Sequence, residues 1–222
     1  MMKKLLMLTA VLVSLNVLGF CCIHPIFAQE SDVTIGFEAG SGAVPPLNPD
    51  DPTQPLESGD MGTGESGSLA LNYISPIAFG THTVSSVEQI YNSTTLKPFV
   101  QVTDLRGTGS GWELRATAGL FENAEGATIN GAILTFLDGE PLSAVPGAAP
   151  PMCPNEISLP ADGTSSAIIM SAGNDEGKGT WLCRWYPETG PNNDAITLTI
   201  PAAIANIGNY TSSVLWSLVD AP

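Results

Sequence analysis

Residues 99–114 read FVQVTDLRGTGSGWEL, which indicates two β-strands joined by a glycine-rich turn. The first part of this stretch is rich in β-branched and aromatic residues, and a second strand-like run starts at Trp112. Glycine recurs at every second position of the turn, where it permits tight or left-handed backbone conformations. Because residues two apart share one face of a strand, Trp112 and Leu114 lie on one face and Glu113 on the other.

Similar strand-like runs occur along most of the chain, separated by Gly, Pro, Asn and Asp. No stretch has a sustained apolar period of 3.6 residues, which an amphipathic helix would need. The sequence therefore predicts an all-β fold, a single β-sandwich or barrel-like domain. We expect strands at residues 33–37, 69–74, 83–91, 99–105, 112–118, 132–137, 167–171, 178–186, 195–200 and 210–219.

Two segments differ from this pattern. Residues 38–67 are acidic, rich in Pro and Gly, and contain no aromatic residue, so they predict a long flexible loop that buries little apolar area. Residues 142–193 contain a Pro- and Ala-rich stretch and two polar turns, and we interpret them as an elaboration between core strands. The domain as a whole is expected to span residues 29–222.

The first 28 residues predict a secretory signal peptide. Lys3 and Lys4 precede an apolar stretch at residues 5–20, and Ala28 offers a small residue for cleavage before Gln29. No second apolar segment appears near the C-terminus. We therefore expect a secreted protein that has no membrane partner once the signal is removed.

Composition argues against several classes of function. The net charge is −15 at pH 7, and an acidic surface disfavours nucleic acid and anionic lipid as partners. After the signal, His82 is the one histidine left, so a histidine-rich metal site is excluded by count. No sequence motif of a catalytic nucleophile accompanies His82. We expect no enzymatic activity, no cofactor and no bound metal.

Two cysteines, Cys153 and Cys183, remain beyond the signal as an even pair. In an exported chain such a pair favours a disulfide, and two free buried thiols are the alternative. The bridge would close a loop of about 30 residues and stabilise the fold by roughly 3 kcal/mol in the chain-entropy model.

A second Trp-x-Leu tripeptide, Trp216-Ser217-Leu218, stands in the last strand-like run. Trp216 and Leu218 again share one strand face. Two interpretations are open for both tripeptides. The Trp and Leu side chains fill the core, as large apolar residues usually do, or the indole faces stack on sugar rings.

The two tripeptides with their flanks resemble the signatures of the WxL domain of Gram-positive surface proteins. Residues 99–112 resemble the first signature, residues 198–222 the second, and residues 73–80 an early strand of the family. The region around the two cysteines does not match the family pattern. The resemblance implies a cell-surface protein, found at the cell wall, that binds peptidoglycan without a covalent link.

It further implies that the peptidoglycan-binding residues are Trp112, Glu113, Leu114, Trp216, Ser217 and Leu218. The alternative function is a subunit of a surface complex that docks a partner, such as another surface protein encoded in the same WxL cluster, instead of binding the wall itself.

Two further groups are candidates for accessory contacts. Arg106 in the glycine-rich turn either pairs with Asp104 or meets a carboxylate of a peptide stem. Trp181, Arg184 and Trp185 surround Cys183, and they either pack around the disulfide or form a ridge for a partner protein.

Overall fold

The structure is a computed structural model that describes residues 31–220, apart from 42–43, 58, 60–61, 146 and 188–189. The chain divides into two units, residues 1–36 and 37–222, which are described separately. The predicted signal peptide lies outside the described residues. Within the described part, no helix is long and apolar enough to cross a membrane.

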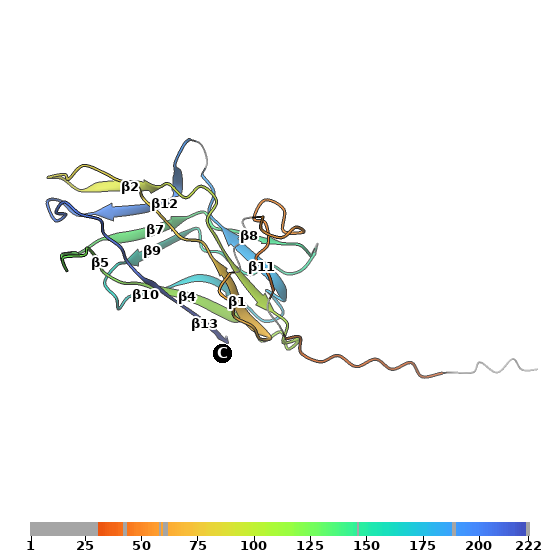
Figure 1. The fold of residues 1–222 in the computed structure, drawn as a ribbon. Helices are drawn as coiled ribbons and strands as arrows, with labels where there is room; N and C mark the ends of the chain where they lie inside the picture. Colours follow the sequence, from red (N-terminus) through yellow and green to blue (C-terminus); the bar gives the residue numbers. More distant parts are fainter. Residues whose placement is uncertain are drawn as a thin grey trace, which may run out of the picture. The chain divides into compact units, whose positions relative to one another are not determined.

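Every regular element in the described residues is a β-strand, which confirms the predicted all-β fold (Figure 1). The strands are β1 (Leu69–Ile74), β2 (Gln89–Ser93), β3 (Phe99–Asp104), β4 (Trp112–Ala118), β5 (Phe121–Glu122), β6 (Thr128–Ile129), β7 (Ile133–Leu137), β8 (Glu140–Ser143), β9 (Glu156–Pro160), β10 (Ser166–Ala172), β11 (Gly179–Arg184), β12 (Asn193–Ile200) and β13 (Val214–Asp220).

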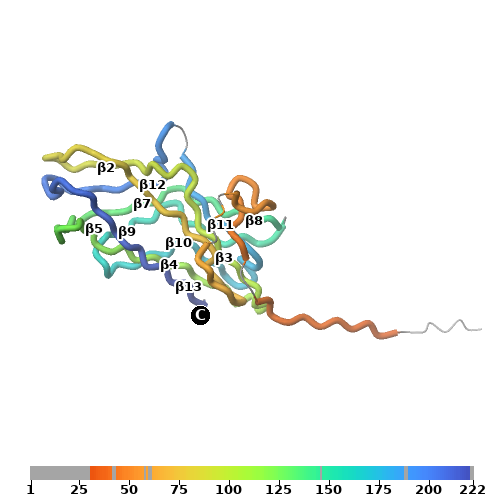
Figure 2. The backbone as a smooth tube through the Cα atoms, in the orientation of Figure 1, coloured from red at the N-terminus to blue at the C-terminus, as the bar shows by residue number. Residues whose placement is uncertain are grey.

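These strands form antiparallel sheets, and Figure 2 labels most of them along the backbone. The sheets share one hydrophobic core. The strand orders are β1-β3-β11-β8, β10-β4-β13 and β2-β12-β7-β9, with a short β5-β6 pair beside them. The glycine-rich turn at residues 105–111 carries the chain from β3 in the first sheet to β4 in the second. Fully buried side chains from all three large sheets, including Val102, Leu114 and Ile196, meet in the core.

All but one of the predicted runs overlap a strand of the structure. The exception is residues 33–37, where the sequence predicts a strand and the structure has none. Val33, Ile35 and Phe37 are 92%, 78% and 88% exposed, so this prediction is wrong. The alternation of apolar residues is present, but no neighbouring strand pairs with it in the described part of the chain.

The segment 142–193 is part of the sheets and not an elaboration between them. It supplies β9, β10 and β11, which pair with β7, β4 and β3. The sequence also missed β8, which contains Pro141. A proline is tolerated there because β8 lies at the edge of its sheet, where one side of the strand needs no hydrogen-bond partner.

Part of the acidic loop is packed against the domain, contrary to the flexible loop predicted for residues 38–67. Leu47 and Leu56 contact a second apolar cluster formed by Tyr73, Phe99 and Leu182 on the other face of the β1-β3-β11-β8 sheet. The composition of the segment, which lacks aromatic residues and is rich in Pro and Gly, predicts little apolar burial, but two partly buried leucines supply the contact. We call residues 44–57 the cover segment.

Gln101 on β3 attaches the cover segment through its backbone. This side chain is fully buried; its Oε1 accepts a hydrogen bond from the Leu47 amide at 2.7 Å, and its Nε2 donates to the Pro45 carbonyl at 3.1 Å. Arg184 also donates to the Pro49 carbonyl at 2.6 Å. Every residue of β3 is therefore buried, because both faces of its sheet are covered.

The predicted disulfide between Cys153 and Cys183 is present, with the two Cα atoms 6.3 Å apart. It ties the segment before β9 to the centre of β11. Cys183 is fully buried and Cys153 is 8% exposed, so the bridge belongs to the core.

Candidate functional site

The two Trp-x-Leu tripeptides lie side by side on neighbouring strands. β13 pairs with β4 antiparallel and without a register shift, so that Leu218 is opposite Leu114 and Trp216 is opposite Ala116. Residues opposite one another in a sheet share a face. The Trp and Leu side chains of both tripeptides therefore point to the same side, toward the core.

The first tripeptide is fully buried. Trp112 and Leu114 are both 0% exposed, and the Trp112 Nε1 donates to the Gly177 carbonyl at 3.3 Å. Gly177 has a positive φ of 63°, and a side chain there would collide with the indole. The space around Trp112 thus depends on glycine, and this indole has no face available to a ligand.

The second tripeptide is at the margin of the core. β13 is an edge strand, and the side chains of Trp216 and Leu218 are partly buried and packed against the core. Trp216, unlike Trp112, lines an open cleft. The central position of β4 and the edge position of β13 account for this difference.

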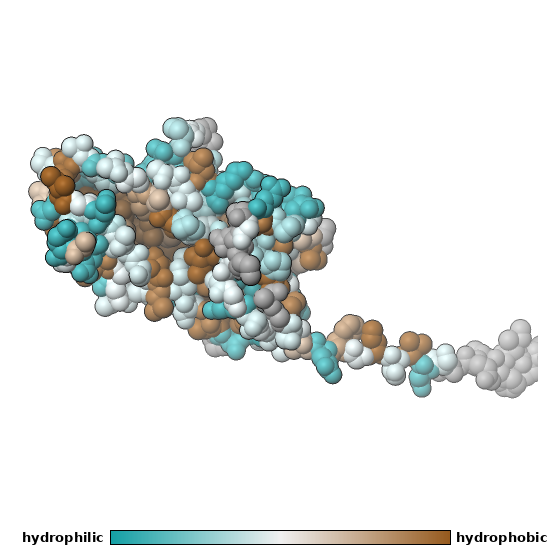
Figure 3. All heavy atoms as spheres, in the orientation of Figure 1, coloured by the Kyte–Doolittle hydropathy of each residue, from teal (hydrophilic) through white to brown (hydrophobic). Residues whose placement is uncertain are grey.

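This cleft, which we call the β13 cleft, has a volume of about 880 Å³. It lies between β13, the connection from β1 to β2, and the loop that precedes β13, with β7 and β12 contributing to its lining. Figure 3 shows hydrophobic surface gathered in the hollow on this side of the domain. Its ring-bearing residues are Phe79, His82, Tyr91, Phe121, Tyr210 and Trp216.

No Asp, Glu, Lys or Arg stands among the described residues that line the β13 cleft, although the chain as a whole carries a net charge of −15. Its polar groups are hydroxyls and amides, for example those of Thr83, Gln89 and Asn209. Such a lining suits an uncharged ligand that offers flat apolar faces and hydrogen-bonding edges.

Ring contacts organise one end of the cleft. The rings of His82 and Tyr91 stack with centroids 3.9 Å apart, and a ring nitrogen of His82 is 2.6 Å from the Phe79 carbonyl oxygen. Tyr210 accepts a hydrogen bond from the Asn206 amide at 3.3 Å. These contacts orient the rings before any ligand arrives, which lowers the entropic cost of binding.

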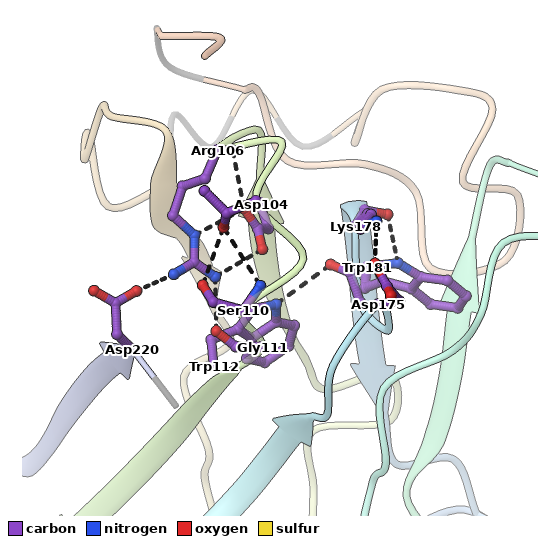
Figure 4. Close-up of polar contacts among 11 residues, drawn as sticks. Asp104, Arg106, Ser110, Gly111, Trp112, Asp175, Lys178, Trp181 and Asp220 are labelled. Carbon is purple, nitrogen blue, oxygen red and sulfur yellow. Dashed lines mark hydrogen bonds and ion pairs between the residues drawn. The ribbon is translucent and has the colours of Figure 1, made fainter. Parts of the chain in front are cut away.

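Arg106 lies at the opposite end of β13 and is held by three partners (Figure 4). Its guanidinium donates to both carboxylate oxygens of Asp104, at 3.0 and 2.8 Å, and to the Gly111 carbonyl at 2.7 Å. It also forms an ion pair with Asp220, the last residue of β13. Arg106 therefore pairs with Asp104, the first of its two predicted roles, and it also joins the glycine-rich turn to β13, which the sequence did not predict.

We call the contacts of Arg106 with Asp104, Gly111 and Asp220 the clamp. The charges of its Asp104–Arg106 pair follow from the burial of Asp104 and the hydrogen bonds between the two side chains. Burial of Asp104 acts to raise the pKa of its carboxyl, but the hydrogen bonds and charge of Arg106 outweigh burial, so the pKa lies below its usual value. The Asp104 hydrogen bond is also the main reason that the Arg106 pKa is raised. Both groups thus stay charged at neutral pH.

The other candidate contacts are distributed over buried and exposed positions. Trp181 and Trp185 are 4% and 1% exposed and lie in the core beside the disulfide, in line with the packing role and not with an exposed ridge. The Trp185 ring meets Phe136 at 5.0 Å. Arg184 forms an ion pair with Glu140 and so is not free.

Glu113 and Ser217 face away from the β13 cleft. Glu113 forms an ion pair with Arg115 two residues along β4, and Ser217 is exposed on the outer face of β13. Of the six motif residues, the structure thus brings Trp216 alone to the lining of the cleft. The described residues contain no group of three or more His, Cys, Asp or Glu placed to hold a metal.

The sequence interpretation missed most of the cleft. From the sequence, His82 is weighed only as a metal-binding or catalytic residue, and Tyr91 is placed only within the strand expected at residues 83–91. Phe79 and Tyr210 stand in the stretches that resemble the family, and this was the one signal that could have marked them. Their convergence depends on contacts between segments more than a hundred residues apart, which one sequence does not display.

Comparison with known proteins identifies the family. The family model described as WxL domain surface cell wall-binding matches residues 28–222, nearly the whole chain. No curated protein and no solved structure matches the chain. The chain therefore belongs to the WxL-domain family and is a cell-surface protein that binds the cell wall.

Proposed function

We propose that the chain is a secreted, non-catalytic protein of a Gram-positive bacterium that holds peptidoglycan through the β13 cleft, after removal of a signal peptide at residues 1–28. The observation that carries this proposal is the cleft itself. It is open and rich in aromatic rings, its described lining residues carry no charged side chain although the protein is acidic, and the second WxL tripeptide contributes Trp216 to it.

The ligand we propose is the sugar backbone of peptidoglycan. Pyranose rings have weakly polar faces that stack on indole and phenol rings, and their hydroxyl and amide groups match the hydroxyls and amides of the cleft. The carboxylates of peptide stems would then point out of the cleft. Non-covalent contacts of this kind are reversible, so the protein would exchange between the wall polymer and solution.

The two tripeptides then have unequal roles. Trp216 contacts the glycan, while Trp112 and Leu114 hold β4 in place beside β13. Leu218 packs β13 on the core. Glu113 and Ser217 lie on the opposite face and make no contact with a glycan in the cleft.

The test is a pull-down of residues 29–222 on protein-free peptidoglycan sacculi, with Tyr91→Ala and Trp216→Ala beside the wild type. Leu215→Ala is the matched control, because Leu215 stands next to Trp216 but is 71% exposed on the other face. Saturable binding that falls about tenfold or more in the cleft variants, and not in the control, is expected; a tenfold loss corresponds to about 1.4 kcal/mol.

Circular dichroism and a melting curve establish that each variant is folded. Folded cleft variants that bind as well as the wild type would overturn the cleft as the glycan site. A folded wild type that does not bind sacculi at all would overturn direct attachment.

A second candidate function is docking of a partner surface protein, with wall contact made by that partner. The specific observation in its favour is that no described strand pairs with the outer edge of β13. A free strand edge can add a strand from another chain. The sacculi experiment separates the two functions, because it contains no other protein.

A further inference from the structure

A second hollow adjoins the β13 cleft. It has a volume of about 530 Å³, is more open than the cleft, and lies between residues 119–124 and the loop that precedes β13. Asn209 and Thr211 line both hollows, so the two meet at these residues. We call the second hollow the β5 pocket, because Glu122 of β5 lines it.

The short strand β5 presents one side chain to each hollow. Phe121 lines the cleft and Glu122 lines the β5 pocket, as the alternation of side chains along a strand requires. The backbone holds this arrangement: the Glu122 amide donates to the Thr211 carbonyl at 2.9 Å, and the Thr211 amide donates to the Glu122 carbonyl at 3.0 Å. The carboxylate of Glu122 therefore stands beside the cleft.

The two hollows differ in charge. The described residues that line the cleft include no Asp, Glu, Lys or Arg, whereas the lining of the β5 pocket includes one carboxylate, that of Glu122. The other residues of the pocket lining, such as Leu120, Asn123 and Ser213, are neutral. A ligand that fills both hollows would therefore combine an uncharged body with a positively charged group.

The chain itself has no cation left for Glu122. Of its seven Lys and Arg residues, Lys3 and Lys4 belong to the predicted signal peptide. The other five are all described, and each forms an ion pair with a carboxylate other than Glu122. These pairs are Lys97–Asp50, Arg106–Asp104, Arg115–Glu113, Lys178–Asp175 and Arg184–Glu140. A positive partner for Glu122 must therefore come from outside the chain.

We propose that the β5 pocket binds a primary ammonium group of the wall polymer, with Glu122 as its ion-pair partner, while the glycan occupies the β13 cleft. The inference rests on the proposed function and names a second chemical feature of the same ligand. An ammonium group has three N–H donors. The carboxylate accepts from it, and the neutral Asn209, Thr211 and Ser213 offer further oxygen acceptors around the pocket.

The contact would add selectivity more than affinity. Glu122 is exposed, so its ion pair with an ammonium group is weakened by water and by salt. The same carboxylate repels anionic groups, such as the carboxylates of peptide stems and the phosphates of other wall polymers. The β5 pocket would thus favour stretches of polymer that carry a free amine.

The test measures binding isotherms of residues 29–222 on two preparations of peptidoglycan sacculi, one untreated and one with its amines acetylated. The variant is Glu122→Gln, which keeps the shape of the side chain and removes its charge. Glu125→Gln is the matched control, because Glu125 is exposed in the same hairpin but does not line the β5 pocket. The control also reports the effect of one negative charge fewer on the approach to an anionic wall.

Acetylation should weaken binding of the wild type and of Glu125→Gln about threefold at low ionic strength, because an exposed ion pair is lost. Glu122→Gln should bind untreated sacculi about threefold more weakly than Glu125→Gln and should not respond to acetylation. At about 1 M salt, where the Debye length is about 3 Å, the differences should vanish.

Either of two results would overturn the ammonium site. In one, Glu122→Gln binds untreated sacculi as well as Glu125→Gln does. In the other, acetylation weakens Glu122→Gln as much as the wild type, so that another part of the protein recognises the amine. Melting curves establish that both variants are folded; neither substitution touches the backbone hydrogen bonds between Glu122 and Thr211.

The ammonium group has two possible sources, the side chain of a diamino acid in a peptide stem and a glucosamine that has lost its acetyl group. Glycan strands freed of stems by an amidase, with and without acetylation, separate them as competitors of sacculi binding by the wild type. Weaker competition after acetylation assigns the amine to the sugar. Equal competition assigns it to the stem.

The tryptophan variant keeps this inference separate from the proposed function. If Trp216→Ala loses binding while Glu122→Gln and Glu125→Gln bind equally, wall attachment through the cleft stands and the ammonium site falls. A folded wild type that binds neither preparation of sacculi overturns wall attachment, and the ammonium site falls with it.

Discussion

The two Trp-x-Leu tripeptides have the same spacing and neighbouring positions in one sheet, yet their environments differ. Trp112 and Leu114 on the central strand β4 are completely buried, whereas Trp216 and Leu218 on the edge strand β13 are partly buried. A strand with neighbours on both sides and a covered face leaves no surface for a ligand. The role of each tryptophan is therefore decided by the position of its strand and not by the tripeptide.

The substitution Trp112→Ala is the strongest test of the difference between the two tryptophans. Truncating a fully buried Trp leaves a large cavity, so the free energy of unfolding should fall by about 3–5 kcal/mol. Urea denaturation followed by circular dichroism measures this change. A loss below about 1 kcal/mol, similar to that of an exposed residue, would contradict the structural role assigned to Trp112.

A substitution of Arg106 tests whether the stability of the domain depends on the clamp at the C-terminal end of β13. Arg106→Met should lower the free energy of unfolding by about 2 kcal/mol at pH 7, because the carboxylate of Asp104, whose side chain is 3% exposed, loses its charged partner. The measurement is urea denaturation at pH 7, with Arg115→Met as the control, since Arg115 is more exposed.

The same variant has a defined pH dependence. The folded-state pKa of Asp104 lies below its unfolded value, so its contribution to stability is present above the unfolded pKa and is lost as the pH falls through the folded pKa. In Arg106→Met, the guanidinium no longer opposes burial, so the pKa of Asp104 rises and the protonated acid is favoured over more of the acid range. The difference in stability between wild type and variant should shrink between pH 7 and pH 3; a constant difference would contradict the clamp.

Trp216→Ala tests the other half of the comparison. Because its side chain is partly buried, we expect a loss of about 1–2 kcal/mol in the free energy of unfolding, smaller than for Trp112→Ala. The folded variant should bind sacculi at least about tenfold more weakly. Equal destabilisation by the two substitutions would show that both tryptophans are core residues alone.

Glu113→Gln should have the smallest effect. It removes an ion pair with Arg115 in which the two side chains are 29% and 39% exposed, and such pairs contribute about 0–1 kcal/mol. Neither the unfolding free energy nor sacculi binding should change measurably. A loss of wall binding would place the ligand on the outer face of the sheet and not in the β13 cleft.

The strands expected at residues 69–74 and 112–118 coincide with β1 and β4, and the even pair of cysteines correctly predicted the disulfide. The sequence failed where the outcome depends on distant segments. VTIGF at residues 33–37 has a strand pattern but finds no partner in the described structure, and residues 142–193 resemble an insertion but supply three strands of the sheets.

The candidate site was predicted less well than the fold. The tripeptides indicated the β10-β4-β13 sheet, which borders the cleft. The alternation that places Trp and Leu on one strand face does not reveal whether that face is buried in the core or lines a cleft. The cleft is built from rings such as Phe79, Tyr91 and Tyr210, which only the packing of three remote segments brings together.

The way in which Gln101 holds the cover segment has a consequence for how this protein can change in evolution. The glutamine bonds the amide of Leu47 and the carbonyl of Pro45, both of which are backbone groups. These two hydrogen bonds do not depend on which side chains stand at positions 45 and 47, whereas replacing Gln101 would remove both of them. Exposed positions of the segment, such as Glu57, can therefore change without loss of these two attachments, whereas position 101 cannot.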